Sequence, residues 1–228
     1  MQMYETGGKV VAFDQARGDM RFPVIAEMQA YWEALRAGRL VPLRSEVDPR
    51  GIEQALENAF ILERIAPQVA RFRLAGSHLN DLMGMEVRGM PLTAFFTPAA
   101  RAEMAEQIEA VFQGPQVADF TLTGETGIGK PPILARLVLL PLRSDLGDVT
   151  RALGCLVSDG QIGRAPRRFD LSTIRTGRIE AGRPAIHGAA PTMAEARPVA
   201  APGMADAPAP YRSGQGQRAH LRLVKSED

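Results

Sequence analysis

A glycine-rich segment at residues 124–130 constrains the fold of this chain more than any other part of the sequence. It reads Gly-Glu-Thr-Gly-Ile-Gly-Lys, which has the glycine spacing and the lysine of a phosphate-binding P-loop. A P-loop continues with Ser or Thr, whose hydroxyl holds magnesium, and then enters a helix whose amides face the phosphates. Here Pro131 and Pro132 follow instead, and proline has neither a hydroxyl nor an N–H group.

The sequence on either side of these glycines favours a β-hairpin. Residues 118–123 alternate apolar and polar side chains with the period of a strand. Residues 133–140 are apolar almost throughout, which does not suit a helix on the protein surface. Because glycine-rich sequence between two strands is typical of a hairpin loop, nucleotide binding at 124–130 is the least favoured function considered below.

Composition narrows the class of protein. The 228 residues are 45% hydrophobic and 23% charged, as in ordinary soluble domains. No stretch approaches the roughly 20 apolar residues of a membrane span, and the first residues lack the pattern of a secretory signal. The single cysteine, Cys155, excludes an internal disulfide and suits a reducing compartment. We therefore expect a cytoplasmic protein that does not enter a membrane.

The composition divides the chain into three parts. Residues 1–22 form an N-terminal extension, and residues 23–159 carry the apolar patterns of a folded domain. Residues 160–228 are rich in Ala, Pro, Gly and Arg, and they hold too few bulky apolar side chains to offset the entropy of ordering. We expect 160–228 to be mostly disordered.

The formal charge of the predicted tail is +5, against −4 for residues 1–159. The arginines that contribute most to its basic stretch are Arg164, Arg167, Arg168, Arg175, Arg178 and Arg183. Nucleic acids bind dense basic patches, and this one is dilute, so we do not expect a nucleic-acid partner.

Residues 23–159 predict an α+β domain. A helix covers 23–36 and ends before Gly38, and a second helix begins at Asp48 and extends to Phe60. Further predicted elements are a strand at 69–76, a short helix at 78–83, a long helix at 98–113, and strands at 117–123, 133–140 and 151–158. Consecutive antiparallel strands pair as neighbours, and the long helix buries its apolar face against the sheet.

This order of elements, with several local strings, resembles a PAS domain of the alphaproteobacterial PAS_5 family. The strings are Tyr-Trp-Glu-Ala-Leu-Arg at 31–36, Val-Pro-Leu-Arg-Ser at 41–45, Phe-Arg-Leu-Ala-Gly-Ser at 72–77 and Leu-Leu-Pro-Leu at 139–142. The resemblance spans roughly residues 23–158. It implies a five-stranded antiparallel sheet with helices on one face, and a sensory or interaction role without catalysis.

Two sets of apolar side chains are candidates for binding. One set is expected inside the domain: Phe72, Leu74, Phe95, Phe96, Met104, Ile108, Phe112 and Phe120. It predicts either a filled core or the walls of a pocket for a small apolar ligand. The other set lies on the first helix: Met28, Tyr31, Trp32 and Leu35. It predicts a helix that covers the sheet of its own chain or packs against a second subunit.

The resemblance also bears on cofactors. Haem-binding PAS domains commonly ligate iron through a histidine on the long helix, and that helix has none here, since His78 lies at the start of the short one. Flavin photosensors of this fold use a reactive cysteine on a short helix, whereas Cys155 lies in a predicted strand and is expected to act as a small hydrophobe. We therefore expect neither haem nor covalently bound flavin.

Two further groups of residues suggest no chemistry. The three histidines, His78, His187 and His220, are too far apart in the sequence to suggest a metal site. The acidic residues Glu103, Glu106 and Glu109 are expected to form the solvated face of the long helix. The sequence thus predicts a non-catalytic regulatory protein that acts through protein partners, as a homodimer, with a small-molecule sensor as the alternative.

Overall fold

The computed structural model describes residues 21–185, all within one compact unit. Its elements are α2 (Pro23–Arg36), η1 (Arg44–Glu46), η2 (Pro49–Ala55), β1 (Ala59–Ala66), β2 (Val69–Ala75), α3 (Ser77–Met83), η3 (Leu92–Phe95), α4 (Arg101–Gln113), β3 (Gln116–Gly124), β4 (Leu134–Leu142), β5 (Arg151–Asp159) and β6 (Phe169–Arg178). None of the helices in this range has the length and hydropathy that crossing a bilayer requires.

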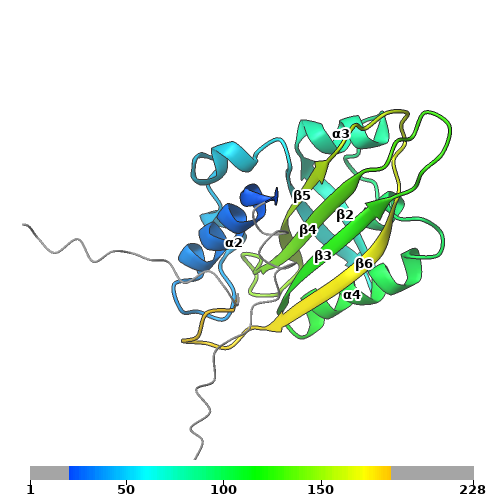
Figure 1. The fold of residues 1–228 in the computed structure, drawn as a ribbon. Helices are drawn as coiled ribbons and strands as arrows, with labels where there is room; N and C mark the ends of the chain where they lie inside the picture. The colour runs from blue at the N-terminus through cyan, green and yellow to red at the C-terminus, as the bar shows by residue number, and fades with distance from the viewer. Residues whose placement is uncertain (1–20, 186–228) are drawn as a thin grey trace, which may run out of the picture. The chain divides into compact units, whose positions relative to one another are not determined.

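The strands form one antiparallel sheet in the order β2-β1-β5-β4-β3-β6 (Figure 1). The sheet therefore has six strands, and the prediction of five was wrong. The sixth strand, β6, pairs along the whole length of β3 and lies in the region predicted to be disordered. That prediction is wrong for residues 160–185. The rest of the predicted tail and residues 1–20 lie outside the described residues.

Strand β1 was missed because its sequence continues the apolar spacing of the preceding helix. The predicted helix from Asp48 to Phe60 is the 3₁₀ helix η2, which ends at Ala55, and Ala59 begins β1. Four consecutive residues at the start of β1 are buried. A strand inside a sheet that is covered on both faces has this continuous apolar pattern, which periodicity alone does not separate from a buried helix.

Helical elements cover both faces of the sheet, which corrects the prediction that they lie on one. The helices α3, η3 and α4 share one apolar cluster with one set of alternating strand residues, and α2 and η2 share a second cluster with the other set (Figure 1). In β5, for example, Leu156 faces α4 and Cys155 faces α2. We call these the α4 face and the α2 face.

Helix α2 is held to the sheet by apolar packing and one buried polar contact. It begins at Pro23, and Ile25, Met28 and Trp32 are completely buried against the sheet of the same chain. The indole of Trp32 is satisfied by a backbone carbonyl of β4. Figure 1 shows α2 next to β4 and β5, the two strands that it contacts. This arrangement is one of the two that the sequence left open.

The last turn of α2 is fastened to the chain that follows β6. The side chain of Arg36 is completely buried and pairs with Glu33 at 2.5 Å. It also donates hydrogen bonds to the carbonyl oxygens of Arg39, at 2.6 Å, of Glu180, at 3.1 Å, and of Arg183. A buried guanidinium group needs such a set of acceptors, and here they come from both ends of the described chain.

Candidate functional site

Seven of the eight residues predicted to line an internal pocket share one buried cluster. They are Phe72, Phe95, Phe96, Met104, Ile108, Phe112 and Phe120. The aromatic rings in this cluster pack on one another. The ring centroids of Phe60 and Phe72 are 5.1 Å apart, and those of Phe72 and Phe95 are 5.4 Å apart. These are the separations of aromatic pairs in a packed core.

The eighth residue, Leu74, does not belong to this cluster, so its assignment to the pocket was wrong. It is 54% exposed. In the pairing of β2 with β1, Phe72 lies opposite Leu62, but Leu74 lies opposite Ile61, so β2 holds one extra residue, Arg73. This β-bulge turns Leu74 to the α2 face, whereas simple alternation would place it beside Phe72. A bulge of this kind leaves no signal in the local sequence.

Leu74 borders a hollow on the part of the α2 face that α2 leaves open. Two adjoining depressions, of about 200 and 400 Å³, share Arg44, Ile61 and Leu74 as lining residues. We call the combined hollow the outer groove. It runs from η2 across β1 and β2 to the loop that joins β4 to β5.

One half of the outer groove is apolar. Its lining includes Val47, Ile52, Leu56, Ile61, Leu74 and Leu153. Leu56 is 41% exposed, so two large apolar side chains, Leu56 and Leu74, stand open to solvent at this site. Gly76 allows the backbone after β2 to approach the turn before β1 closely, because a Cβ atom there would lie only 2.2 Å from the carbonyl oxygen of Glu57.

The other half of the outer groove is basic. Four arginines line it, together with Ser144 and Asp145: Arg44, Arg73, Arg88 and Arg151. Glu63 forms ion pairs with both Arg73 and Arg151, so one carboxylate is shared between two guanidinium groups. Within residues 21–185, the side chains of Arg44 and Arg88 form no ion pair. This half of the groove therefore has an excess of positive charge.

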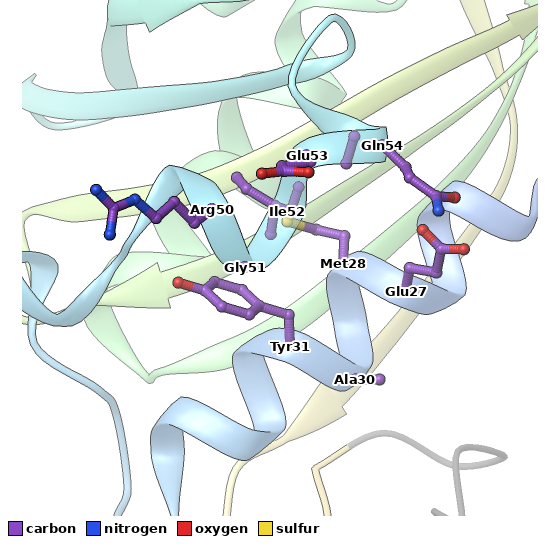
Figure 2. Close-up of a pocket in the computed structure, with 10 residues that line it drawn as sticks. Glu27, Met28, Ala30, Tyr31, Arg50, Gly51, Ile52, Glu53 and Gln54 are labelled. Carbon is purple, nitrogen blue, oxygen red and sulfur yellow. The ribbon is translucent and has the colours of Figure 1, made fainter.

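A second groove, of about 510 Å³, lies between α2 and η2 (Figure 2). Figure 2 shows Met28 and Ile52 between the two helices, with Glu27 and Gln54 at one end and Arg50 at the other. Its charged lining residues are Glu27, Glu53 and Arg50, so both signs of charge are present around it.

Tyr31, which also lines this second groove, is fixed by its neighbours. Its ring packs over Gly51, where a Cβ atom would lie 2.3 Å from the ring. Its hydroxyl accepts a hydrogen bond of 2.8 Å from the amide of Asp48 and donates one of 3.0 Å to the carbonyl of the same residue.

The predicted interface on the first helix is largely occupied within the chain. Met28 and Trp32 are completely buried, and Tyr31 and Leu35 are half-buried. In this conformation Met28 and Trp32 have no surface to offer a second subunit. Tyr31 and Leu35 retain part of theirs.

The loop at 124–130 is a hairpin turn, as the sequence predicts. The chain before and after it forms the paired strands β3 and β4. Its amides bond within the protein: Glu125 donates to Arg168 at 2.8 Å, and Gly127 and Lys130 donate to each other's carbonyls at 3.1 and 2.9 Å. The Lys130 ammonium pairs with Glu125, whose pKa this hydrogen bond lowers. The amides of Glu125, Gly127 and Lys130 and the ammonium group of Lys130 therefore bind groups of the protein itself, and in this conformation they do not point to a phosphate site.

Arg167 in the predicted basic tail is part of the core. It is completely buried and donates to the carbonyl oxygens of Ile162 at 2.7 Å, Pro131 at 2.8 Å and Glu125 at 3.1 Å. It thus joins the 124–132 turn to the segment before β6. Arg167 was predicted to lie in a sparse basic stretch of a disordered tail, and that placement was wrong. The sequence carries no signal of its burial, because all three acceptors are backbone groups.

Glu109 also differs from its prediction. The sequence placed it on the solvated face of α4, but it is buried. Its carboxylate pairs with Arg64 and accepts a hydrogen bond of 2.8 Å from the amide of Gln68. The hydrogen bond from Arg64 lowers the pKa of Glu109 below its ordinary value. The pair connects α4 to the turn between β1 and β2.

The two residues considered for cofactor chemistry have structural surroundings. Cys155 is completely buried in β5, and burial raises the pKa of its thiol to about 12. His78 is half-buried, its Nε2 lies 3.0 Å from the hydroxyl of Ser158, and burial lowers its pKa. Among residues 21–185, no three His, Cys, Asp or Glu side chains are grouped closely enough to hold a metal ion.

Comparison with known proteins relates the chain to one family. No curated protein matches the sequence. Among solved structures, the light state of the blue-light photoreceptor Aureochrome1 LOV shows 14% identity and a TM-score of 0.35, covering 49% of this chain and 88% of its own. The dark structure shows 16% identity and a TM-score of 0.35, with 48% and 80% covered. A structure from a flavin-analogue study of a Light-Oxygen-Voltage domain shows 18% identity and a TM-score of 0.34, and the match covers 49% of this chain and 84% of that one.

The family match covers more of the chain than these structures do. It extends over residues 20–157, from the residue before the described part of the chain to two residues before the end of β5, and it identifies a PAS domain. It includes α2, both clusters of helical elements and five of the six strands, and it leaves out β6. The chain belongs to the PAS domain family PAS_5.

Proposed function

We propose that this protein is a non-catalytic regulatory PAS protein that binds an acidic, partly apolar segment of a partner protein in the outer groove. The observation that carries the proposal is the position of Leu74, an exposed leucine beside two arginines, Arg44 and Arg88, that form no ion pair within residues 21–185. The partner is defined by this chemistry: apolar side chains next to Asp or Glu.

The apolar half of the groove supplies the binding energy in this proposal. Leu56 and Leu74 are 41% and 54% exposed and border the same hollow. Covering such side chains is favourable by roughly 25 cal/mol for each Å² of apolar surface removed from water. Large apolar side chains gathered around a hollow are typical of a protein-binding surface.

The basic half sets the choice of partner. Arg44 and Arg88 form no ion pair with the described residues, whereas Arg73 and Arg151 already share Glu63. An acidic segment would therefore find two available guanidinium groups at the end of the groove. Such charges at an interface speed association and exclude partners of the wrong sign.

Contact, rather than an internal ligand or a reaction, is favoured by the state of the other candidate groups. The rings around Phe72 pack at core separations, the thiol of Cys155 is buried with a raised pKa, and Lys130 is paired with Glu125. These groups, which the sequence suggested for ligand, cofactor or nucleotide binding, thus have structural surroundings.

The test begins with a photo-crosslinking amino acid, p-benzoylphenylalanine, placed at Leu74 in the full chain inside its native cell. The matched control places it at Ile128, which is 96% exposed on the 124–132 turn. We expect a discrete cross-linked partner from position 74 that position 128 does not give. Mass spectrometry of the product then identifies the partner and its cross-linked segment.

Binding of the purified partner would then be measured by calorimetry at several salt concentrations. We expect Leu74→Asp to weaken binding by at least about tenfold and Ile128→Asp to leave it unchanged. Arg44→Glu with Arg88→Glu should weaken binding and reduce its dependence on salt. Equal cross-linking from both positions, or a partner whose affinity ignores Leu74, would remove the outer groove as the site.

A further inference from the structure

Strand β6 is the last strand of the sheet, and within residues 21–185 no further strand pairs with its outer edge. At the opposite end, β2 is covered by the chain at 89–91, since the amide of Phe72 donates to Met90 and the amide of Gly89 donates to Phe72. On β6 the first residue is covered in this way by the amide of Thr97, and the hydroxyl of Thr97 also donates a hydrogen bond to the carboxylate of Asp170. Among the described residues, the backbone at 171–178 bonds to no neighbour other than β3. An open edge of this length is a template for another strand.

A β-bulge gives this edge an unusual symmetry. Thr173 lies opposite Thr121 of β3 and Leu171 lies opposite Leu122, so Ser172 is an extra residue in β6. The hydroxyl of Ser172 lies 2.7 Å from that of Thr123, which places it on the α2 face with Thr173. Leu171 and Ile174 both pack against the cluster on the α4 face, although only two residues, Ser172 and Thr173, separate them.

The side chains of β6 are therefore arranged symmetrically about the midpoint between Ser172 and Thr173. Ser172 and Thr173 face one side, Leu171 and Ile174 face the other, and Asp170 and Arg175 again share the first side. A regular strand cannot do this, because adjacent residues alternate. If two copies of β6 paired as antiparallel strands about a two-fold axis at this midpoint, side chains on the α2 face of one copy would lie opposite side chains on the α2 face of the other, and the same would hold for the α4 face.

We propose that β6 pairs with β6 of a second copy of this chain, about a two-fold axis between Ser172 and Thr173. In this register Asp170 of each copy lies opposite Arg175 of the other, and Leu171 lies opposite Ile174. Opposite charges and apolar pairs that face each other across strands stabilise a sheet, and two-fold symmetry provides each pair twice. The two sheets become one continuous sheet, and the outer groove, which lies near β2, stays open in both copies.

Charge exchange tests the register. The full chain would be examined by sedimentation equilibrium from low to high micromolar concentration. We expect a dimer that Arg175→Asp weakens by at least about tenfold, because two pairs of like charges then face each other. Asp170→Arg should do the same, and the chain carrying both changes should recover the affinity of the native dimer. Arg164→Asp, an exposed arginine before β6, is the control for net charge.

Cross-linking tests the same register independently of affinity. A chain with Asp170→Cys and Arg175→Cys should form covalent dimers under mild oxidation, because each new cysteine faces its counterpart in the other copy. Either change alone, or Asp170→Cys with Arg178→Cys, should not. The native Cys155 is buried and does not compete.

Three results would overturn the proposal. They are a chain that stays monomeric at high micromolar concentration, a dimer that ignores both charge reversals, and equal cross-linking in the register control. The dimer does not depend on the proposed function, since Leu74→Asp should leave sedimentation unchanged while it weakens binding of the purified partner in calorimetry.

Discussion

The indole nitrogen of Trp32 donates a hydrogen bond of 2.9 Å to the carbonyl oxygen of Pro141. Strand β3 pairs with β4 only as far as Leu139, so Pro141 lies beyond that pairing. A proline is tolerated in a strand where the ladder on one side has ended. Helix α2 therefore supplies the hydrogen-bond donor for the Pro141 carbonyl that β3 does not supply. This hydrogen bond anchors α2 to the sheet.

Replacing Trp32 by Phe should lower the free energy of unfolding by about 1–3 kcal/mol, because the carbonyl of Pro141 stays buried without its donor. Trp32 is the only tryptophan, so unfolding in urea is followed by circular dichroism instead of fluorescence. Leu146→Ala, at a side chain that is 92% exposed, is the control and should have little effect. A Trp32→Phe protein as stable as this control would contradict the anchoring role.

The ion pair of Glu109 and Arg64 should make stability depend on pH. The hydrogen bond from Arg64 holds the pKa of Glu109 below its ordinary value of 4.5, so folding favours the charged carboxylate. Its contribution is complete above pH 4.5 and is lost as the pH falls through the lower, folded-state pKa. We expect Glu109→Gln to cost about 1–3 kcal/mol at neutral pH and progressively less in acid.

Urea unfolding at neutral pH and at several values below pH 4.5 would measure this difference. Glu106→Gln, an exposed residue on the same helix, is the matched control. Parallel losses of stability for the two variants across the acid range would refute a specific role for Glu109.

A methyl group added at Gly154 should strain the core. Its Cβ would lie 2.2 Å from the ring of Phe60, which faces it across the pairing of β1 and β5. Overpacking of this kind costs about 1–3 kcal/mol, so Gly154→Ala should lower the unfolding temperature. Gly127→Ala, where nothing lies within 4 Å, should not. If both variants unfold at the same temperature, the packing of Phe60 on Gly154 is not tight.

Arg167 should control the order of the 124–132 turn. Arg167→Met removes the donor to Glu125, Pro131 and Ile162 and leaves three carbonyl oxygens without their partner. We expect a loss of about 3 kcal/mol or more and faster hydrogen exchange at 124–132 and 160–168. Arg164→Met, at an exposed arginine nearby, is the control. Unchanged exchange in both segments would show that the turn orders itself.

Elements governed by local sequence were predictable. Helix α2 has its start at Pro23 and its stop before Gly38, and the 124–130 turn has glycines between two apolar runs. The PAS fold followed from the order of these elements, and the family match confirms it. The placement of Phe72, Phe95 and Phe120 inside the domain followed from their spacing on elements that the sequence defines well, although the sequence left a filled core and a pocket both open.

What the sequence did not disclose depends on contacts between distant segments. Leu74 reaches the outer groove through a bulge, and Glu109 is buried because Arg64 in β1 pairs with it. Strand β6 has few bulky apolar residues, and it forms because its backbone hydrogen-bonds to the edge of β3. In each case the deciding partner is far away in the chain, so patterns of period 2 or 3.6 carry no trace of it.

The guanidinium group of Arg36 draws its acceptors from Arg39 and from Glu180 and Arg183, beyond β6. A shortened protein that stops at residue 157, where the family match ends, would lose two of these acceptors. It would also leave one edge of β3 without the strand that pairs with it. The minimal autonomous unit for expression and biophysics therefore runs past Arg183, and family boundaries understate it.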